Sequence, residues 1–347
     1  FRKHFQTQSA PSNCQIKIAI LGKTGTGKSS VADTILGDKM FQIGDTGISE
    51  TSECQSETRC VYGGNVTLID TPGLFDTDQS EEDLKAEIVK CITECSPGPH
   101  AFLIAFNVAK FTNQEQEVIN KINQYFSEEA FKYATVLFTH GDQLKDGQTI
   151  EQYFHNNHLM SDLMKKCGGR CHVVDNKHWK NNQPDDYRSN QFQVKQLMKT
   201  INYMIEANNG SCYTNEVLQA VEKLRQVEEE KIRQLSGNKT EDEIREKAKK
   251  RVFKRLLINL VCGTTCAMLG ALFGGVRVVG GATGSVMPGD LLKAIKKGYS
   301  TTKEAHTATE AIVRAANAVC NEVKLFTDQE KTAENKSESK PLIGPDS

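Results

Sequence analysis

The sequence lacks an excess of charge of either sign. It holds 43 lysine and arginine residues against 44 aspartate and glutamate residues, for a formal net charge of −1 and a pI of about 6.8. This balance gives no reason to expect a protein that binds nucleic acid or an acidic substrate through its overall charge. Any basic feature that matters to function must therefore be local.

The sequence also lacks an apolar signal-peptide core, because its first fifteen residues are polar. We expect residues 1–13 to form a flexible leader. The 11 cysteines are scattered and odd in number, which does not suit a disulfide framework. Together with the phosphate-binding motif described below, they indicate reduced thiols and a cytoplasmic protein.

The 347 residues are enough for about two domains, and their composition changes along the chain. From residue 14 to residue 213, apolar runs alternate with helical patterns. This predicts an α/β domain in which helices cover both faces of a parallel or mixed sheet. The apolar runs lie at 16–21, 66–69, 101–106, 134–138 and 171–174.

The remainder of the chain predicts an all-α extension with four parts. These are a charged amphipathic helical stretch at 214–255, a Gly-rich apolar segment at 256–289, an amphipathic helix at 290–326 and a disordered tail at 327–347. The charged stretch is compatible with a coiled-coil seam and equally with packing against the α/β domain.

Residues 22–29 match the phosphate-loop pattern G-x-x-x-x-G-K-[ST] at every fixed position, with a strand pattern before them and a helical pattern after. Glycines let consecutive backbone N–H groups point at phosphate oxygens, and the helix start adds positive potential. We expect Lys28 to reach the β- and γ-phosphates and Ser29 to offer its hydroxyl to Mg²⁺. The predicted binding residues of this loop are Gly22, Lys23, Thr24, Gly25, Thr26, Gly27, Lys28, Ser29 and Ser30.

A second phosphate-facing element is the stretch 66–73, an apolar strand that ends in Asp70 and continues as D-x-x-G. A carboxylate at a strand end can hold Mg²⁺, usually through water. We expect Asp70 to have this role and the N–H of Gly73 to sense the γ-phosphate.

A polar loop rich in serine and threonine is predicted from Gly44 to Thr58, between the two motifs. A threonine of such a loop often completes the Mg²⁺ shell in GTPase switches. Thr51 is our candidate, with Thr46 and Ser49 as alternatives. The predicted Mg²⁺ ligands are therefore Ser29, Thr51 and Asp70.

Residues that can select a base follow the apolar run 134–138. The carboxylate of Asp142 can accept two hydrogen bonds from guanine N1 and N2, which adenine cannot supply. The motif resembles [NT]-K-x-D, with His140 in place of the lysine. One strand later, Asn176 can reach the purine edge. Trp179 either covers the base or is an ordinary packed side chain. The predicted ligand is thus GTP or GDP.

These residues resemble a known family, the immunity-associated nucleotide-binding GTPases, also called the IMAP or AIG group. The resemblance covers about residues 14–213 and rests on the motifs above and on the stretches 49–54, 98–104 and 111–115. The last two are similar to a box that this family carries between its third and fourth nucleotide motifs, and the stretch 49–54 supports Thr51. The resemblance implies GTP and GDP binding, a homo- or heterodimer formed across the nucleotide face, and association with an intracellular membrane.

Two departures from the family pattern bear on hydrolysis. Lys110 stands where members often carry arginine, and lysine supplies a point charge but not a planar fork. Leu74 follows Gly73, where small signalling GTPases have a water-orienting glutamine. We therefore expect weak GTPase activity in the monomer, and the alternative is a GTP-loaded membrane scaffold that barely turns over. The candidate catalytic residues are Lys28, Thr51 and Lys110.

The stretch from Leu256 to Val276 contains no charged residue and is close to the length that crosses a bilayer. Small residues at a spacing of four suit close helix contact in lipid, and basic residues flank the stretch on both sides. Asn259 and Arg277 count against deep burial. We expect residues 256–289 to insert into a membrane, and the alternative is a hairpin packed inside the protein.

Overall fold

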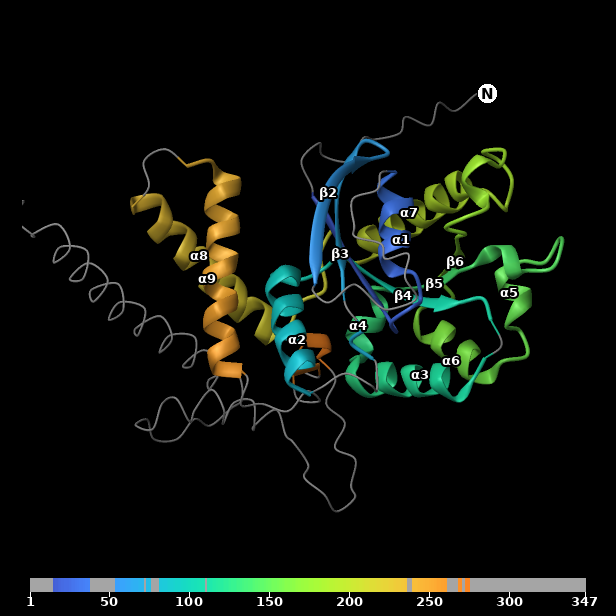
Figure 1. Cartoon of the computed structure of the whole chain (residues 1–347), viewed down its shortest axis with the longest axis horizontal. Coiled ribbons are helices and arrows are strands. Elements are labelled where there is room, and N and C mark those ends of the chain that lie inside the picture. The colour runs from blue at the N-terminus through green and yellow to red at the C-terminus, as the bar shows by residue number, and fades with distance from the viewer. Residues whose placement is uncertain are drawn as a thin grey trace, which may run out of the picture.

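The computed structural model describes residues 15–37, 54–71, 73–75, 81–109, 111–235, 239–260, 268–269 and 272–274. These residues form one mixed sheet covered by helices on both faces, followed by two long helices (Figure 1). The predicted fold class is confirmed in this part of the chain. The predictions that fall outside the described residues concern Thr46, Ser49, Thr51, Lys110, the leader 1–13, most of 256–289, and all of 290–326 and 327–347.

The sheet has six strands in the order β2-β3-β1-β4-β5-β6. The neighbouring pairs are parallel except for β2 and β3, which are antiparallel. All five apolar runs predicted to be strands are strands. The bounds are Ile16–Gly22 (β1), Gln55–Val61 (β2), Gly64–Asp70 (β3), Ala101–Asn107 (β4), Ala134–Thr139 (β5) and Cys171–Val173 (β6).

Strand β2 corrects the prediction of a polar loop over 44–58, because residues 55–58 belong to this strand. Its side chains from Gln55 to Cys60 are half-buried or exposed, and Val61 alone in the strand is buried. The strand lies at one edge of the sheet and pairs only with β3 among the described strands. Because β2 is an edge strand and little of it is buried, its sequence contains no apolar run from which the strand could be predicted.

Alternate residues of β1 pack on opposite faces of the sheet, as the pleat of a strand requires. Ala19 and Leu21 belong to a core shared with α2 and α3, whereas Ile18 and Ile20 belong to a core shared with α1 and α7. The helices of this α/β part are α1 (Lys28–Leu36), α2 (Glu81–Cys95), α3 (Asn113–Tyr125), α4 (Glu128–Lys132), α5 (Ile150–Tyr153), α6 (His158–Lys166) and α7 (Asn190–Ala207), with 3-10 helices η1 (Gly141–Gln143) and η2 (Trp179–Asn181).

The predicted charged stretch forms two helices, α8 (Glu216–Leu235) and α9 (Glu241–Leu260), which we call the α8–α9 hairpin. A capping box starts α9. The N–H of Glu243 donates to the Thr240 hydroxyl at 3.3 Å, and the N–H of Thr240 donates to the Glu243 carboxylate at 3.0 Å. Because α9 continues to Leu260, it crosses the predicted boundary between residues 255 and 256.

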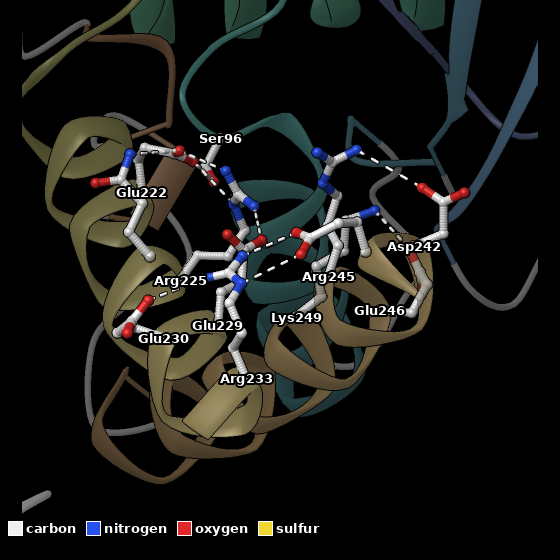
Figure 2. Close-up of polar contacts among 12 residues, drawn as sticks. Ser96, Glu222, Arg225, Glu229, Glu230, Arg233, Asp242, Arg245, Glu246 and Lys249 are labelled. Carbon is white, nitrogen blue, oxygen red and sulfur yellow. Dashed lines mark hydrogen bonds and ion pairs between the residues drawn. The ribbon is translucent and has the colours of Figure 1, made fainter. Parts of the chain in front are cut away.

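The α8–α9 hairpin packs beside α2, at the left of Figure 1. The ammonium of Lys249 on α9 lies 3.0 Å from the carboxylate of Glu94 on α2. The Ser96 hydroxyl, just after α2, donates to Glu222 on α8 at 3.3 Å (Figure 2). Of the two arrangements that the sequence left open, the described residues adopt the one in which the charged helices pack against the α/β domain.

Four described residues of the candidate membrane segment are buried in the core beneath α2 and α3: Met268, Leu269, Leu272 and Phe273. The ring of Phe273 stacks on Phe126 with the centroids 4.4 Å apart, and its carbonyl accepts the N–H of Ser127 at 3.0 Å. At these positions the segment adopts the alternative, packing inside the protein. Within the described part of the chain, no helix combines the length and the hydropathy that crossing a bilayer requires.

Candidate functional site

The loop between β1 and α1 has the backbone that a phosphate cradle requires. Gly25 and Gly27 have φ angles of +80° and +76°, a region that favours glycine. Gly22 is required for a different reason, because a Cβ there would lie 2.8 Å from the carbonyl oxygen of Ala105 on β4. Gly27 is the N-cap of α1, so the loop leads directly into a helix N-terminus.

Lys28 holds a positive charge inside this loop. The residue is only 6% exposed, and its ammonium donates to the carbonyl oxygen of Lys23 at 3.1 Å. The hydroxyl of Thr26 donates to the same carbonyl at 2.8 Å, which closes the turn. Lys23 in turn donates to Gln114 of α3 at 2.5 Å. A buried ammonium beside a helix N-terminus is an environment that favours an anion.

Ser29 and Asp70 meet where α1 begins and β3 ends. The Ser29 hydroxyl donates to Asp70 Oδ2 at 2.6 Å. Asp70 is fully buried, and among the described residues its Oδ1 has no hydrogen-bond partner. Burial raises the pKa of this carboxyl and outweighs the opposing effects of Ser29 and Lys28. A hydroxyl and a buried carboxylate with an unsatisfied oxygen fit the hard oxygen ligands that Mg²⁺ takes.

The residues after Asp70 decide whether this edge of the site can orient a water molecule for hydrolysis. Gly73 is buried, and Leu74 is 1% exposed and belongs to the core under α2 and α3. Its apolar side chain cannot orient a nucleophilic water, so the position of the usual glutamine supplies no catalytic group. Thr51 and Lys110, the other predicted catalytic residues, lie outside the described residues and stay predictions.

Asp142 lies in η1, directly after β5, and its side chain is 37% exposed. His140 precedes η1 in a left-handed conformation, with φ at +59°. A hydrogen bond with the carboxyl of Asp175 and partial burial raise the pKa of Asp142. The imidazole of His178 lies 3.9 Å from Asp142. The predicted base-reading carboxyl is therefore accessible, and it is paired with a second carboxyl.

Asp175 shapes the loop after β6. Its Oδ1 accepts the N–H of Lys177 at 2.9 Å and also the N–H of His178. The side chain of Asn190, at the start of α7, binds both the N–H and the carbonyl of Asp175, at 3.0 and 2.6 Å. The main chain on both sides of Asn176 is thereby fixed.

Asn176 lies against the start of α1. Its Oδ1 accepts the hydroxyl of Thr34 at 3.1 Å, and its Nδ2 lies 3.1 Å from the point where a Cβ on Gly27 would stand. The loop after β6 and the phosphate loop are therefore neighbours. This arrangement is the one that a single nucleotide, with a base at one end and phosphates at the other, requires.

Thr139 and Trp179 fix the loop that carries Asp142. The buried hydroxyl of Thr139 donates to the carbonyl of Thr26 in the phosphate loop at 2.9 Å and lies 2.7 Å from Asn107 Oδ1. Trp179 is 3% exposed, and a Cβ on Gly141 would lie 2.5 Å from its indole ring. Of the two roles considered for Trp179, the packed side chain is the one observed.

The described site residues lie at or just after the carboxyl ends of β1, β3, β5 and β6. Thr24 is in the phosphate loop and Ser30 in the first turn of α1, where its carbonyl accepts the Thr34 hydroxyl at 2.8 Å. Sequence reasoning missed four residues: Asn107, Thr139, Asp175 and Asn190. The first three directly follow the apolar runs 101–106, 134–138 and 171–174, and polar residues at strand ends are a signal that could have identified them.

Comparison with known proteins identifies a matching family and several similar proteins. A family model described as the AIG1 family matches residues 16–232. Immune-associated nucleotide-binding protein 8 of Arabidopsis thaliana is 36% identical over 207 residues, which cover 58% of this chain and 56% of that protein. GTPase IMAP family member 8 of Mus musculus is 33% identical over 192 residues, which cover 54% of this chain and 27% of that protein.

Among solved structures, the chain is similar to Toc33 from Arabidopsis thaliana in complex with GDP and Mg²⁺. The TM-score is 0.45 and the identity 17%, over 58% of this chain and 88% of that chain. The match to the two curated relatives is partial, since this chain spans 56% of the length of the first and 27% of the second.

Proposed function

The chain belongs to the AIG1 family, and from that premise we propose that it binds GTP and GDP with Mg²⁺ and hydrolyses GTP weakly. The observation that carries the proposal is the meeting of Ser29 and Asp70 at 2.6 Å beside the buried ammonium of Lys28. Ser29 and Asp70 would hold the ion, which neutralises charge on the phosphates when bound. The mouse relative is named a GTPase, which supports the same function.

Within this proposal, each end of the nucleotide has its own residues. The N–H groups of the phosphate loop and Lys28 bind the phosphates. The carboxylate of Asp142 accepts the two guanine N–H groups, which is a contact that adenine lacks. Asn176 contacts the purine edge. Thr139 fixes the separation of the two ends, because its hydroxyl connects their loops.

Calorimetric titration of the purified chain with GDP, a non-hydrolysable GTP analogue and ATP tests the binding proposal. Guanine nucleotides should bind in the presence of Mg²⁺, and ATP should not. Replacing Lys28 with alanine should weaken binding by at least about 100-fold, because a charged phosphate contact is lost. The matched control is Lys195→Ala on the exposed surface of α7, which should bind as the wild type does. Equal affinity for GTP and ATP would falsify the assignment.

Weak hydrolysis is proposed because Leu74 is buried where a water-orienting side chain is needed. Single-turnover hydrolysis measured over a range of protein concentrations is the test. A rate that rises with concentration supports a group supplied across a dimer formed through the nucleotide faces. Lys110→Ala should then abolish the rise, and Lys110→Arg should keep or increase it.

The second candidate is a GTP-loaded scaffold that barely turns over, and the same burial of Leu74 favours it. Under this reading, hydrolysis stays at the background rate at every concentration while GTP binding and dimerisation persist. Light scattering under GDP and under the GTP analogue tests the dimer that both candidates require, and the kinetic assay run beside it separates the two.

We also propose that the protein works at an intracellular membrane from the cytoplasmic side. The basic residues that flank the stretch 256–276 support this location. The four residues of that stretch that pack in the protein core do not add to this support. Fractionation of cells that express the full chain, followed by a carbonate wash, is the test. A membrane pellet that survives the wash indicates insertion, release by the wash indicates a peripheral contact, and recovery in the supernatant alone contradicts the proposal.

A further inference from the structure

A pocket of about 300 Å³ opens among the carboxyl ends of β4 and β5 and the helices α3, α5 and α6, which lie together on the right of Figure 1. Its volume is roughly ten times that of a water molecule, so it is far larger than an ordinary packing gap. This volume is at the lower end of the range of small-molecule sites. We call it the aromatic pocket, after the rings that line it: Phe106, Phe111, Phe138, Tyr153 and Phe154.

Three of these rings are buried, and two lie nearer the surface. Phe106, Phe138 and Phe154 are buried, and Phe138 stacks on Phe154 with the ring centroids 5.1 Å apart. Phe111 and Tyr153 are half-buried and pack against the same core. Such rings offer a large apolar contact area, and their faces also attract cations. The aromatic pocket therefore suits a ligand with an apolar body.

Glu115, in the first turn of α3, is the one charged side chain among the described residues that line the aromatic pocket. Its Oε2 accepts the N–H of Thr112 at 3.0 Å in the capping box of α3. No described lysine or arginine forms an ion pair with it. The carboxylate therefore gives the pocket a negative charge that no basic group of the described lining offsets.

The aromatic pocket is separate from the candidate nucleotide site. Its buried rings belong to the core shared with α2 and α3, whereas α1, which follows the phosphate loop, packs on the opposite face of the sheet. Among the described residues, neither the phosphate loop nor Asp70 or Asp142 contributes to its lining. Asn107 connects the two regions, because it lines the pocket and its Oδ1 lies 2.7 Å from the hydroxyl of Thr139.

We propose that the aromatic pocket binds a small organic cation, a protonated amine on an apolar body. The rings supply the contact area for the body, and the rings and Glu115 together favour the positive charge. A ligand with a carboxylate or phosphate would meet the like charge of Glu115. An entirely apolar ligand would remove that carboxylate from water without giving it a partner. The proposal does not rest on the nucleotide binding proposed above.

The charge of Glu115 can be separated from its structural role. A glutamine at this position closes a capping box as glutamate does, because its side-chain oxygen accepts the same N–H. The substitution Glu115→Gln therefore removes the charge and keeps the start of α3 intact. The matched control is Glu117→Gln, since Glu117 is an exposed carboxylate of the same helix outside the described lining of the pocket.

Titration of the full chain with three probes of similar shape tests the ligand class. The probes are 2-phenylethylamine, 2-phenylethanol and 3-phenylpropionate, which carry a positive charge, no charge and a negative charge. Ligand-observed NMR measures binding, with excess GDP and Mg²⁺ present so that the probes do not compete for the candidate nucleotide site. The amine should bind about 10-fold more tightly than the alcohol, on the usual strength of a partly buried cation–π contact. The carboxylate should not bind.

Variants of the pocket locate the contact. Glu115→Gln should weaken amine binding about 10-fold and leave alcohol binding unchanged, which removes the preference for the cation. Glu117→Gln should bind all three probes as the wild type does. Ala109→Trp adds a large side chain at the exposed rim of the pocket and should weaken amine and alcohol binding alike. Thermal unfolding of each variant checks that the fold is kept.

The proposal is overturned by equal affinity for the amine and the alcohol, by tighter binding of the carboxylate, or by no binding of any probe. It is also overturned if the preference for the amine survives Glu115→Gln, or is lost to the same extent in Glu117→Gln. Full binding of the amine by a folded Ala109→Trp protein places the contact elsewhere and has the same consequence. GDP titration of each variant is a separate measurement, so failure of this proposal is distinguishable from failure of the proposed nucleotide binding.

Discussion

The carboxyl edge of the sheet and the α8–α9 hairpin both contain charged side chains, but the pKa values of their carboxyls shift in opposite directions. At the sheet edge, burial raises the pKa of Asp70, and the neighbouring Asp175 raises that of Asp142. In the hairpin, Arg225 lowers the pKa of Glu222 against the effect of burial, and Arg233 lowers that of Glu241.

The difference fits the proposed function, in which a ligand supplies the partners of the sheet-edge carboxyls, whereas the hairpin carboxyls have partners within the protein. A buried carboxylate with an unsatisfied oxygen, such as Oδ1 of Asp70, costs stability, and such a group is typical of a site that a cation or a donor from outside completes. A carboxyl with a protein cation stabilises the fold directly. Neither motif matching nor composition distinguishes these two cases, because the same residue types occur in both regions.

Replacing Asp70 with asparagine should have the largest effect and should change two quantities in opposite directions. We expect the affinity for the Mg²⁺-nucleotide to fall by about 100-fold or more, because a charged metal ligand is lost. The free energy of unfolding without nucleotide should rise, by on the order of 1 kcal/mol, since a buried carboxylate becomes neutral.

Calorimetry measures the first change of this Asp70→Asn variant, and denaturant unfolding of the nucleotide-free protein measures the second. The sign follows from linkage. A carboxyl with a raised folded-state pKa contributes stability at low pH and loses it as the pH rises through that pKa. An Asp70→Asn protein that is less stable than the wild type at neutral pH would show that the buried Asp70 carboxylate does not destabilise the nucleotide-free protein.

Replacing Asp142 with asparagine should weaken guanine nucleotide binding by about 2 kcal/mol, which is about 30-fold. The ionised carboxyl is the form that accepts the guanine N–H groups. Because its pKa is raised, wild-type affinity should decline as the pH falls through a range above that of an ordinary aspartate. Titrations at a series of pH values measure this decline, which the variant should lack. The control is Asp162→Asn, an exposed carboxyl on α6.

Removing the ion pair between Glu94 and Lys249 should lower stability and leave nucleotide affinity unchanged. Both side chains are about 15% exposed, so their coupling should exceed that of a surface pair. A double-mutant cycle with Glu94→Gln and Lys249→Met should give about 1 kcal/mol by thermal unfolding. The exposed pair Asp242 and Arg245, 4.0 Å apart, is the reference and should give close to zero. Equal couplings for the two pairs contradict the description of the hairpin interface.

The smallest expected effect is the pH response of Glu222, which should oppose that of Asp70. With a lowered pKa, Glu222 contributes stability above its unfolded-state pKa and loses it as the pH falls through its folded value. Glu222→Gln should remove less than about 1 kcal/mol of acid-sensitive stability. Unfolding of both proteins from neutral to acid pH measures it. Parallel pH curves for the wild type and the variant rule out this contribution.

Much of the sheet and of the phosphate loop could be predicted from the sequence. Buried parallel strands such as β4 and β5 consist mostly of apolar residues. The loop at Gly22 to Ser29 has a fixed pattern because a backbone that binds phosphate must approach it closely. Strand β2 could not be predicted from apolar runs, since Val61 is its one buried residue and Gln55 to Arg59 are all polar.

The polar supports of the site were harder to predict. The hydroxyl of Thr139 and the carboxyl of Asp175 act through main-chain groups that are distant in sequence, and a single sequence carries no record of such contacts. The position of Phe273 was missed for another reason. Hydropathy measures how apolar a segment is, and it does not tell lipid from a protein core as the surroundings.

The packing of Trp179 under Gly141 has a practical consequence. This is the single tryptophan of the chain, and its indole touches the turn that carries Asp142. Its fluorescence is therefore a built-in optical reporter at the proposed guanine-binding end of the site, and it should allow nucleotide exchange to be followed in real time on the unlabelled, unmutated protein.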